Sequence, residues 1–437
     1  MCGEYECVEG VPSGLIGCTL GCTLGGTEAH IARISPRALW LRVAAPLAGD
    51  APLILAFYHP EQGAYTRMEI QYDRAEPVQC DDRSALVRLS ISDGGYAAAV
   101  RRALADYARY VECMDVGGAA LCGQMLTGYP ADGDEDFHAD LQSQWSAWFG
   151  DGAPLVADAQ GRQTALLLGD PELCAAFLRR GEASVWEFYA HHRGVPRSIL
   201  PEEPPQRLYI GSASCAQLLP DAATLDALLD AAERADLAVT LLLPPLRTGD
   251  GASLEALLRH LESRREPMEL SVNDWGALEL LQGHRDAFEP VLGPLLNKLR
   301  RDPRMQWKAG SAVHNALLAQ SNFNDPHFLA FLRGLGIRRL EYECCDRAID
   351  VPEGHHSLHL PFYHTNTSAW CTLRALCERG DRGMQGPAAH CPHWCARNAQ
   401  LYPKQLNLIG RGNALLALDR SVGAHIPAHI DRLVYNL

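Results

Sequence analysis

The sequence predicts an α/β protein in which a (β/α) TIM-type barrel follows an α+β N-terminal region with a small β-barrel or sandwich. Three observations support this prediction. The 437 residues are too many for one ordinary domain of roughly 100–200 residues. Before residue 96, short segments alternate apolar and polar residues between turn-forming residues, which is typical of antiparallel strands. After residue 206, apolar runs alternate with segments of helical period, which is typical of parallel β/α units.

The chain is expected to contain three structured parts and a linker. Residues 1–95 are predicted to form the small β domain, with a Cys- and Gly-rich start. Residues 96–195 are predicted to be mostly helical, because apolar residues there recur at helical spacing. Residues 196–206, PRSILPEEPPQ, are rich in Pro and acidic residues and are predicted to be a linker. The barrel is predicted to occupy residues 207–437.

The barrel elements are predicted in chain order from the alternation of the two patterns. The first helix opens at Asp221, a residue type that caps helix N-termini. The predicted strands are 207–211, 237–245, 268–274, 305–310, 338–344 and 356–362. The predicted helices are 221–236, 253–264, 287–302 and 326–336.

Charge is distributed unevenly along the chain. The formal net charge is −14, and residues 207–437 carry 24 Lys+Arg against 25 Asp+Glu, so residues 1–206 hold nearly all of the excess. Nucleic-acid binding depends on Lys and Arg that neutralise phosphates, so direct binding by the acidic N-terminal half is disfavoured. No apolar run reaches the ~18 residues that a membrane span needs. The start lacks the basic and apolar regions of a secretory signal peptide, so a cytoplasmic location is expected.

Cysteines point to a metal centre. The chain has 15 Cys and no secretion signal, which disfavours a disulfide framework and favours a soft metal or an iron–sulfur cluster. Cys371, Cys377, Cys391 and Cys395 lie within 25 residues, with spacings of five, 13 and three residues. A zinc ribbon would show two C-x2-C knuckles, whereas a 4Fe–4S cluster tolerates irregular spacing; zinc remains the alternative. Cys215 follows the first predicted barrel strand, and strand ends meet at the barrel mouth, so it is a remote candidate ligand.

Polar residues near predicted strand ends are the candidate catalytic groups. Glu341 and Glu343 alternate on one strand and therefore share a face, where a carboxylate can act as acid or base; a paired or solvated role is the alternative. His364 lies at a strand exit near the cysteines and can relay protons, and Asn315 can donate hydrogen bonds to a substrate. Other histidines cluster nearby, namely His355, His356, His359, His390 and His393.

Several motifs occur in one order along residues 207–437. YIGSASC (209–215), MELSVNDWGAL (268–278), WKAGSAVHNALLAQ (307–320) and RRLEYECCDRA (338–348) are predicted strands that run into polar turns. HLPFYHTNTSAWC (359–371) enters a cysteine-rich loop that ends in C-x3-C and a basic residue, and QLNLIGRGN (405–413) follows. Together these motifs resemble peptidase family U32, the collagenase-like peptidases, and most of all its members that act in oxygen-independent hydroxylation during ubiquinone biosynthesis.

The resemblance implies a 4Fe–4S cluster held by Cys215, Cys391, Cys395 and one of Cys371 or Cys377. It further implies an enzyme that hydroxylates or otherwise modifies a small molecule or an RNA base, with a partner U32 subunit or a second copy of the chain. A U32-type peptidase and a non-catalytic scaffold that carries a cluster or zinc are the alternatives. The stretch Gly380-Asp381-Arg382-Gly383 departs from the pattern of the peptidase members, which disfavours proteolysis.

Overall fold

The structure, a computed structural model, forms two compact units, which are described separately. The first contains the described residues up to 115 together with 312–317, and the second contains the rest. No helix within the described ranges is long and apolar enough to cross a membrane. The structure describes residues 8–9, 16–20, 27–43, 53–59, 64–80, 84–115, 135–157, 159, 161–181, 183–247, 249–264, 268–299, 312–381, 383–387, 390–402 and 407–437.

Two antiparallel sheets and one helix build the first unit, which confirms the predicted antiparallel β region. One sheet has the order β1-β4-β5-β9-β8, from Val8–Glu9, His30–Ser35, Ala38–Val43, Ala85–Ser90 and Arg74–Cys80. The other has the order β3-β2-β6-β7, from Thr27–Glu28, Ile16–Leu20, Leu53–His59 and Ala64–Ile70. Apolar side chains of both sheets share one core. Helix α1 (Gly94–Asp115) joins this core through Tyr96, whose hydroxyl donates to the Ser35 carbonyl at 2.9 Å.

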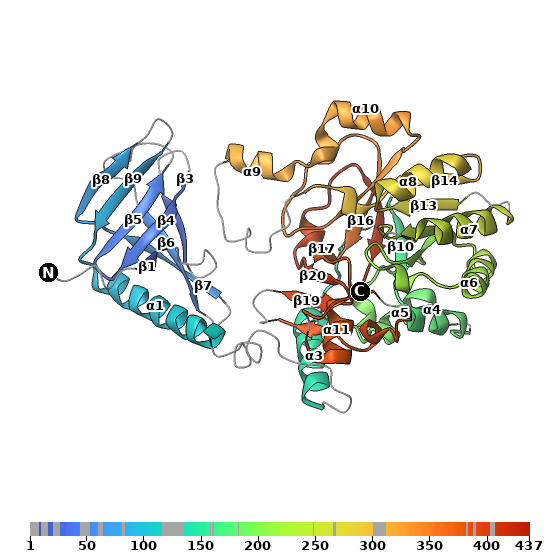
Figure 1. Ribbon diagram of the computed structural model, residues 1–437, viewed down its shortest axis with the longest axis horizontal. Helices are drawn as coiled ribbons and strands as arrows, with labels where there is room; N and C mark the ends of the chain where they lie inside the picture. Colours follow the sequence, from blue (N-terminus) through green and yellow to red (C-terminus); the bar gives the residue numbers. More distant parts are fainter. Residues whose placement is uncertain are drawn as a thin grey trace. The chain divides into compact units, whose positions relative to one another are not determined.

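A closed barrel of eight parallel strands forms the second unit, which confirms the predicted fold class (Figure 1). Apolar and aromatic side chains dominate the buried positions of its strands. The strands in order are β10 (Gln163–Leu168), β11 (Arg207–Gly211), β12 (Ala238–Leu243), β13 (Met268–Val272), β14 (Phe288–Leu292), β15 (Arg339–Glu343), β16 (His355–Leu360) and β21 (Ile430–Tyr435). Helices around it are α4 (Pro171–Leu178), α5 (Val185–Arg193), α6 (Ala222–Arg234), α7 (Gly251–Glu262), α8 (Trp275–Leu281) and α10 (Pro326–Gly334).

The structure differs from the expected division of the chain at two places. The first barrel strand is β10, so residues 196–206 connect two adjacent barrel strands instead of linking domains. The predicted helix 287–302 is instead the strand β14 followed by a 3-10 turn at Pro294–Leu296. Pro290 and Pro294 explain this difference, because proline in a helix interior removes a hydrogen bond and clashes with the preceding turn. The strand predicted at 305–310 lies outside the described residues.

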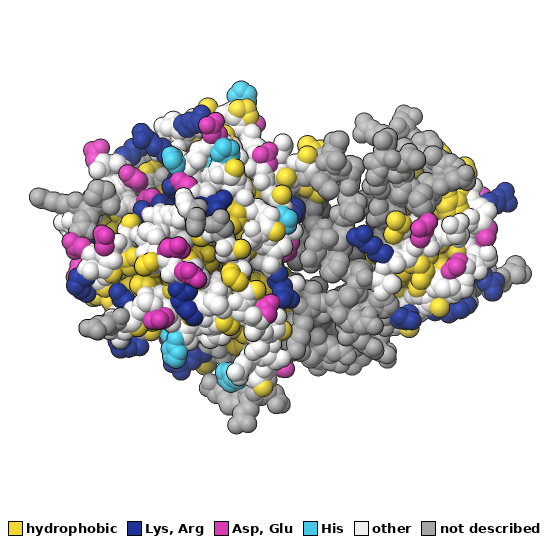
Figure 2. Space-filling view, turned by 180° about the vertical axis from the view of Figure 1, so that it is seen from behind, with side chains coloured by type: hydrophobic (Ala, Val, Ile, Leu, Met, Phe, Trp, Pro, Cys, Tyr) yellow, Lys and Arg dark blue, Asp and Glu magenta, His cyan; other side chains and the backbone are white. Residues whose placement is uncertain are grey.

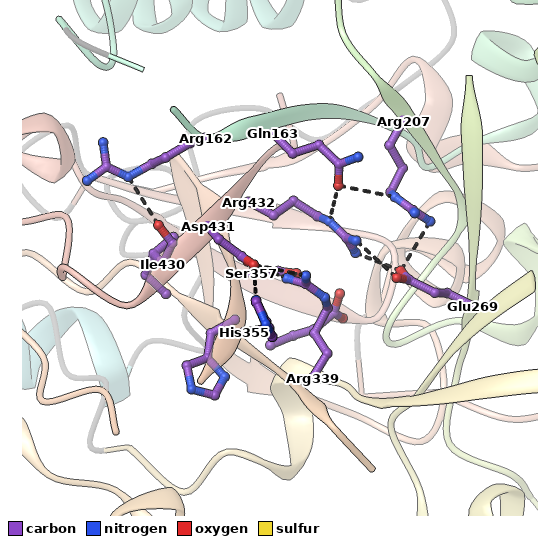
Figure 3. Close-up of polar contacts among 12 residues, drawn as sticks. Arg162, Gln163, Arg207, Glu269, Arg339, His355, Ser357, Ile430, Asp431 and Arg432 are labelled. Atoms are coloured by element: carbon purple, nitrogen blue, oxygen red, sulfur yellow. Dashed lines mark hydrogen bonds and ion pairs between the residues drawn. The ribbon is translucent and has the colours of Figure 1, made fainter. Parts of the chain in front are cut away.

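Charged side chains fill the barrel interior at the end where the strands begin (Figure 3). Glu269 accepts two hydrogen bonds from Arg432, at 2.6 and 3.0 Å, and lies 3.1 Å from Arg207. Burial raises the pKa of Glu269, but these two guanidinium groups outweigh it and hold the pKa at about 2. Arg339 forms a second ion pair with Asp431 at 2.6 Å. These ion pairs lie at the end of the barrel opposite the carboxyl ends of its strands.

An insertion between β16 and β21 lies at the carboxyl ends of the barrel strands. It contains β17 (Phe362–Thr367), α11 (Thr372–Arg379), β18 (Gln400–Leu401), β19 (Leu408–Arg411) and β20 (Ala414–Leu418). The strands form an antiparallel sheet in the order β17-β20-β19-β18. Helix α3 (Glu135–Phe149) packs aromatic rings on it, with Trp145 stacked on Phe362 at 5.8 Å between ring centroids. The insertion therefore has its own sheet and a covering helix.

Candidate functional site

Four of the predicted cysteines come together at the barrel mouth. Cys215 follows β11, Cys371 precedes α11, and Cys391 and Cys395 lie between α11 and β18. The Cys395 thiol interacts electrostatically with those of Cys215, Cys371 and Cys391, and the Cys371 thiol with those of Cys215 and Cys391. We call these four residues the thiol group. Residues more than 150 positions apart in the sequence thus converge at the barrel mouth.

Backbone N–H groups point at the sulfur atoms of three of the four thiols. Cys371 is the N-cap of α11, and its Sγ accepts from the Arg374 N–H at 3.2 Å. The Sγ of Cys391 accepts from the His393 N–H at 3.4 Å. Backbone N–H groups of Gln217 and Leu218 act in the same way on Cys215. Such donors stabilise negative charge on sulfur, and the helix N-terminus adds to the effect at Cys371.

Burial raises the pKa of the thiols of Cys215, Cys371 and Cys395. It raises the pKa of Cys371 to about 11, and Cys215 and Cys391 add to the rise while the Arg374 N–H opposes it. Burial and then the neighbouring thiols also raise the pKa of Cys395. A thiol in these surroundings is protonated at neutral pH unless a cation is bound, because only a positive charge offsets several buried thiolates.

Cys377 takes a different position from Cys371. It lies on α11, six residues after Cys371, so it is about 9 Å further along the helix axis. The thiols of Cys215 and Cys391 act on Cys371, and those of Cys215, Cys371 and Cys391 act on Cys395. Cys371 therefore lies with Cys215, Cys391 and Cys395 at the barrel mouth, and Cys377 lies within the helix that Cys371 caps.

The spacing of the thiols bears on what they can hold. Among the described residues, no three His, Cys, Asp or Glu side chains lie close enough together to bind one metal ion. A single tetrahedral zinc with Zn–S bonds of about 2.3 Å would require thiolates in near contact. An iron–sulfur cluster is a larger body with a thiolate at each iron, so its ligands stand further apart. Four thiols, three of them with backbone N–H donors at sulfur, are a donor set of the kind that metal centres use.

A cavity of about 120 Å³ opens beside the thiol group. Its wall includes residues from the carboxyl ends of several barrel strands, among them Leu167, Gly211 and Leu242. Cys395, Arg411 and Asn413 line it from the insertion. Carboxyl ends of strands are where barrel enzymes carry their chemistry. One member of the thiol group thus faces a space that a small ligand can enter.

Glu343 and His364 form a pair in the cavity wall. The His364 Nδ1 lies 2.5 Å from the Glu343 carboxylate, and the His364 backbone N–H donates to the same carboxylate at 3.2 Å. The Glu343 side chain is 1 % exposed and that of His364 is 15 % exposed, so the imidazole is the more accessible member. The carboxylate fixes the ring orientation, as expected for a histidine that exchanges protons with a ligand.

Glu341 lies deeper in the barrel and does not line the cavity. Its carboxylate accepts from the hydroxyl groups of Tyr209 at 2.7 Å and Ser271 at 2.5 Å, and it lies 3.3 Å from the His359 Nε2. Burial raises the pKa of Glu341, but His359 and these hydrogen bonds outweigh it and lower the pKa below its ordinary value. His359 does line the cavity, so Glu341 reaches a ligand only through that ring.

Asn315 was predicted as a site residue, whereas Arg411 and Asn413 were not. Asn315 lies in α9 (Ala312–Ala319), but its side chain is outside the described residues. Arg411 and Asn413 line the cavity, and neither was predicted. Burial, together with the nearby Arg193, lowers the pKa of Arg411 to about 10, and its guanidinium lies 5.1 Å from the Trp145 ring. The motif QLNLIGRGN contains both residues, and its Gly-Asn pair between apolar runs is a hairpin signal.

Comparisons with known proteins give one finding. No protein-family model and no curated protein sequence matches the chain. The solved structure of the U32 peptidase Mk0906 matches 63 % of this chain and 92 % of its own, with 11 % sequence identity and a TM-score of 0.30. A likeness at this level supports no statement about the function of this chain.

Proposed function

We propose that this chain is a U32-type iron–sulfur protein in which Cys215, Cys371, Cys391 and Cys395 hold a 4Fe–4S cluster at the barrel mouth. The observation that carries the proposal is the convergence of four half-buried thiols from three chain segments, with backbone N–H groups directed at the sulfur atoms of Cys215, Cys371 and Cys391. A bound cluster would supply one-electron transfer next to the cavity.

We further propose that the cavity is where a small molecule, or a single base of a larger one, is modified by oxygen-independent hydroxylation or a related reaction. Cys395 belongs both to the thiol group and to the cavity wall, so a ligand there would lie beside the cluster. The Glu343–His364 pair can give or take a proton at the imidazole, and Arg411 offers guanidinium N–H donors to a polar ligand.

Proteolysis has less support from the same cavity. A serine peptidase needs a serine hydroxyl within reach of a base. The cavity serines bond otherwise: Ser214 donates to Asn413 at 3.2 Å, and the Ser212 hydroxyl oxygen accepts from the N–H groups of Ser214 and Cys215. Within the part of the chain that the structure describes, neither serine is hydrogen-bonded to a histidine.

Surface charge agrees with a small or partner-delivered substrate. On the face of the barrel unit seen in Figure 2, acidic and basic side chains are interspersed and form no continuous basic patch. A macromolecule with many phosphates requires such a patch.

Anaerobic purification with measurement of iron, sulfide and zinc tests the cluster. The wild type is expected to contain about four irons and four sulfides per chain. Cys371→Ser and Cys391→Ser should lose most of the iron, whereas Cys377→Ser, on the same helix as the matched control, should retain it. One zinc per chain would favour the scaffold alternative, and equal iron in Cys371→Ser and Cys377→Ser would refute the assigned ligand set.

A further inference from the structure

We propose that the two-residue turn Gly412-Asn413 is a positioning device that holds the cysteine segments together before any cluster binds, with Asn413 as its main contact residue. This inference rests on the cysteine site proposed above, but it concerns how the protein alone builds that site. The turn joins β19 to β20, whose flanking residues Arg411 and Ala414 pair with each other.

The Asn413 side chain bridges two cysteine-bearing segments. Its Nδ2 donates to the Ser214 carbonyl at 2.7 Å and to the Ser368 carbonyl at 2.8 Å, and its Oδ1 accepts from the Ser214 hydroxyl at 3.2 Å. Ser214 immediately precedes Cys215, and Ser368 lies three residues before Cys371. An amide with both donors used in this way sets the separation of the two segments.

The backbone of Gly412 contacts the remaining parts of the site. Its carbonyl accepts from the Thr372 hydroxyl at 3.2 Å and from the Leu373 N–H at 3.3 Å, at the start of the helix that Cys371 caps. A Cβ at Gly412 would lie 3.7 Å from the Cys395 Cβ and 3.8 Å from its Sγ, so this backbone packs on Cys395. Gly412 has a φ of +59°, which favours glycine.

Cys391 is joined to the same assembly by a separate contact. His393, two residues later, places its Nε2 2.9 Å from the carbonyl of Gln217, two residues after Cys215. The turn and this histidine together connect every segment of the thiol group. Ordering flexible loops costs conformational entropy. If these loops are ordered when the protein folds, cluster binding does not have to meet that cost.

Site-specific alkylation of the cluster-free protein tests the inference. Under anaerobic conditions, reduced chelator-treated protein is exposed to iodoacetamide, and modification at each cysteine is followed by mass spectrometry. Asn413→Ala leaves two carbonyls without their donor and is expected to speed alkylation of Cys215 and Cys371 about tenfold. Asn366→Ala, an exposed asparagine of the same sheet, is the matched control and should leave both rates unchanged.

A milder variant keeps the test decisive if Asn413→Ala does not fold. Thr372→Val is nearly isosteric and removes only the hydroxyl bond to Gly412, so it should speed alkylation at Cys371 but not at Cys215. Alkylation rates equal to the wild type in Asn413→Ala, or in Thr372→Val where the first variant is unfolded, would overturn the inference.

Cluster retention gives a second readout that separates the two proposals. If the wild type binds iron, Asn413→Ala should lose it to a chelator about ten times faster, the effect expected when a residue that supports metal ligands is removed. If the wild type binds no iron, the cluster proposal fails, and the alkylation rates alone decide whether the turn positions the cysteines. Retention equal to the wild type alongside unchanged alkylation would again overturn the inference.

Discussion

A carboxyl pair just after β15, formed by Asp346 and Asp419, should make the stability of the barrel depend on pH. Asp346 follows β15, accepts a hydrogen bond from the Tyr363 hydroxyl at 2.7 Å, and donates its backbone N–H to Asp419 at 2.9 Å. Burial, and then the nearby Asp419 carboxylate, raise the pKa of Asp346 from 3.8 to about 7. Like charges in a buried site cannot both ionise without cost, so the folded protein retains a proton that the unfolded chain releases.

The sign and size of the effect follow from proton linkage. Because the folded-state pKa lies above the unfolded one, the stabilisation is complete below about pH 4 and is lost as the pH rises towards 7. The expected loss is ~1.4 kcal/mol per pH unit, or ~4 kcal/mol at most across this window. Asn at this position mimics the protonated carboxyl, and it tolerates the backbone φ of +57°.

Urea denaturation of the wild type and Asp346→Asn between pH 4.5 and 8 measures this effect. The variant is expected to gain stability relative to the wild type steadily up to about pH 7, after which the difference stays constant. Comparing the two proteins removes the titration of all other groups. Parallel stability curves for the two proteins would refute the assignment of the raised pKa to Asp346.

Three further outcomes concern the barrel interior. Glu269→Gln leaves Arg207 and Arg432 buried without their carboxylate and should lower the free energy of unfolding by about 3–5 kcal/mol in urea denaturation. The double variant Glu269→Gln/Arg432→Met should lose less free energy of unfolding than the two single variants together, because it leaves one unpaired charge fewer. Losses that simply add in this double-mutant cycle would show that Glu269 and Arg432 are not coupled. Gly211→Ala places a Cβ 2.8 Å from the Leu242 carbonyl at a φ of +103°, so its thermal midpoint should fall, and an unchanged midpoint would contradict this backbone conformation.

The sequence could predict the barrel because most of its strands are short apolar runs between well-capped helices. Asp221, Asp274 and Asp325 each accept a backbone N–H as the N-cap of the helix that follows. β10 was missed because a six-residue strand with an apolar run of four cannot be told from a buried helix segment by periodicity. β14 was predicted as part of a helix for the same reason, although Pro290 within it and Pro294 after it argue against a helix.

The sequence indicated which cysteines to consider together, but not how they are arranged in space. Cys215 could be associated with the C-terminal cysteines because strand ends of a barrel meet, which is a property of topology. That Cys371 is the N-cap of α11 and Cys377 lies within it depends on where that helix begins, which the cysteine spacing does not encode. Asn413 carries no sequence sign of its bonds to Ser214 and Ser368, since those partners are backbone carbonyls that any residue supplies.

The location of the insertion explains how a long cysteine-rich segment can be ordered at the mouth. It leaves the barrel after β16 and returns at β21, and these two strands are hydrogen-bonded neighbours. Its ends are therefore held close together by the barrel, which leaves its interior to be ordered by its own sheet and by bonds to the loop after β11. β21 also pairs with β10 and so closes the ring. Only the closed barrel brings the loop of Cys215 beside the insertion, so the thiol group should form together with the barrel and be lost when the barrel opens.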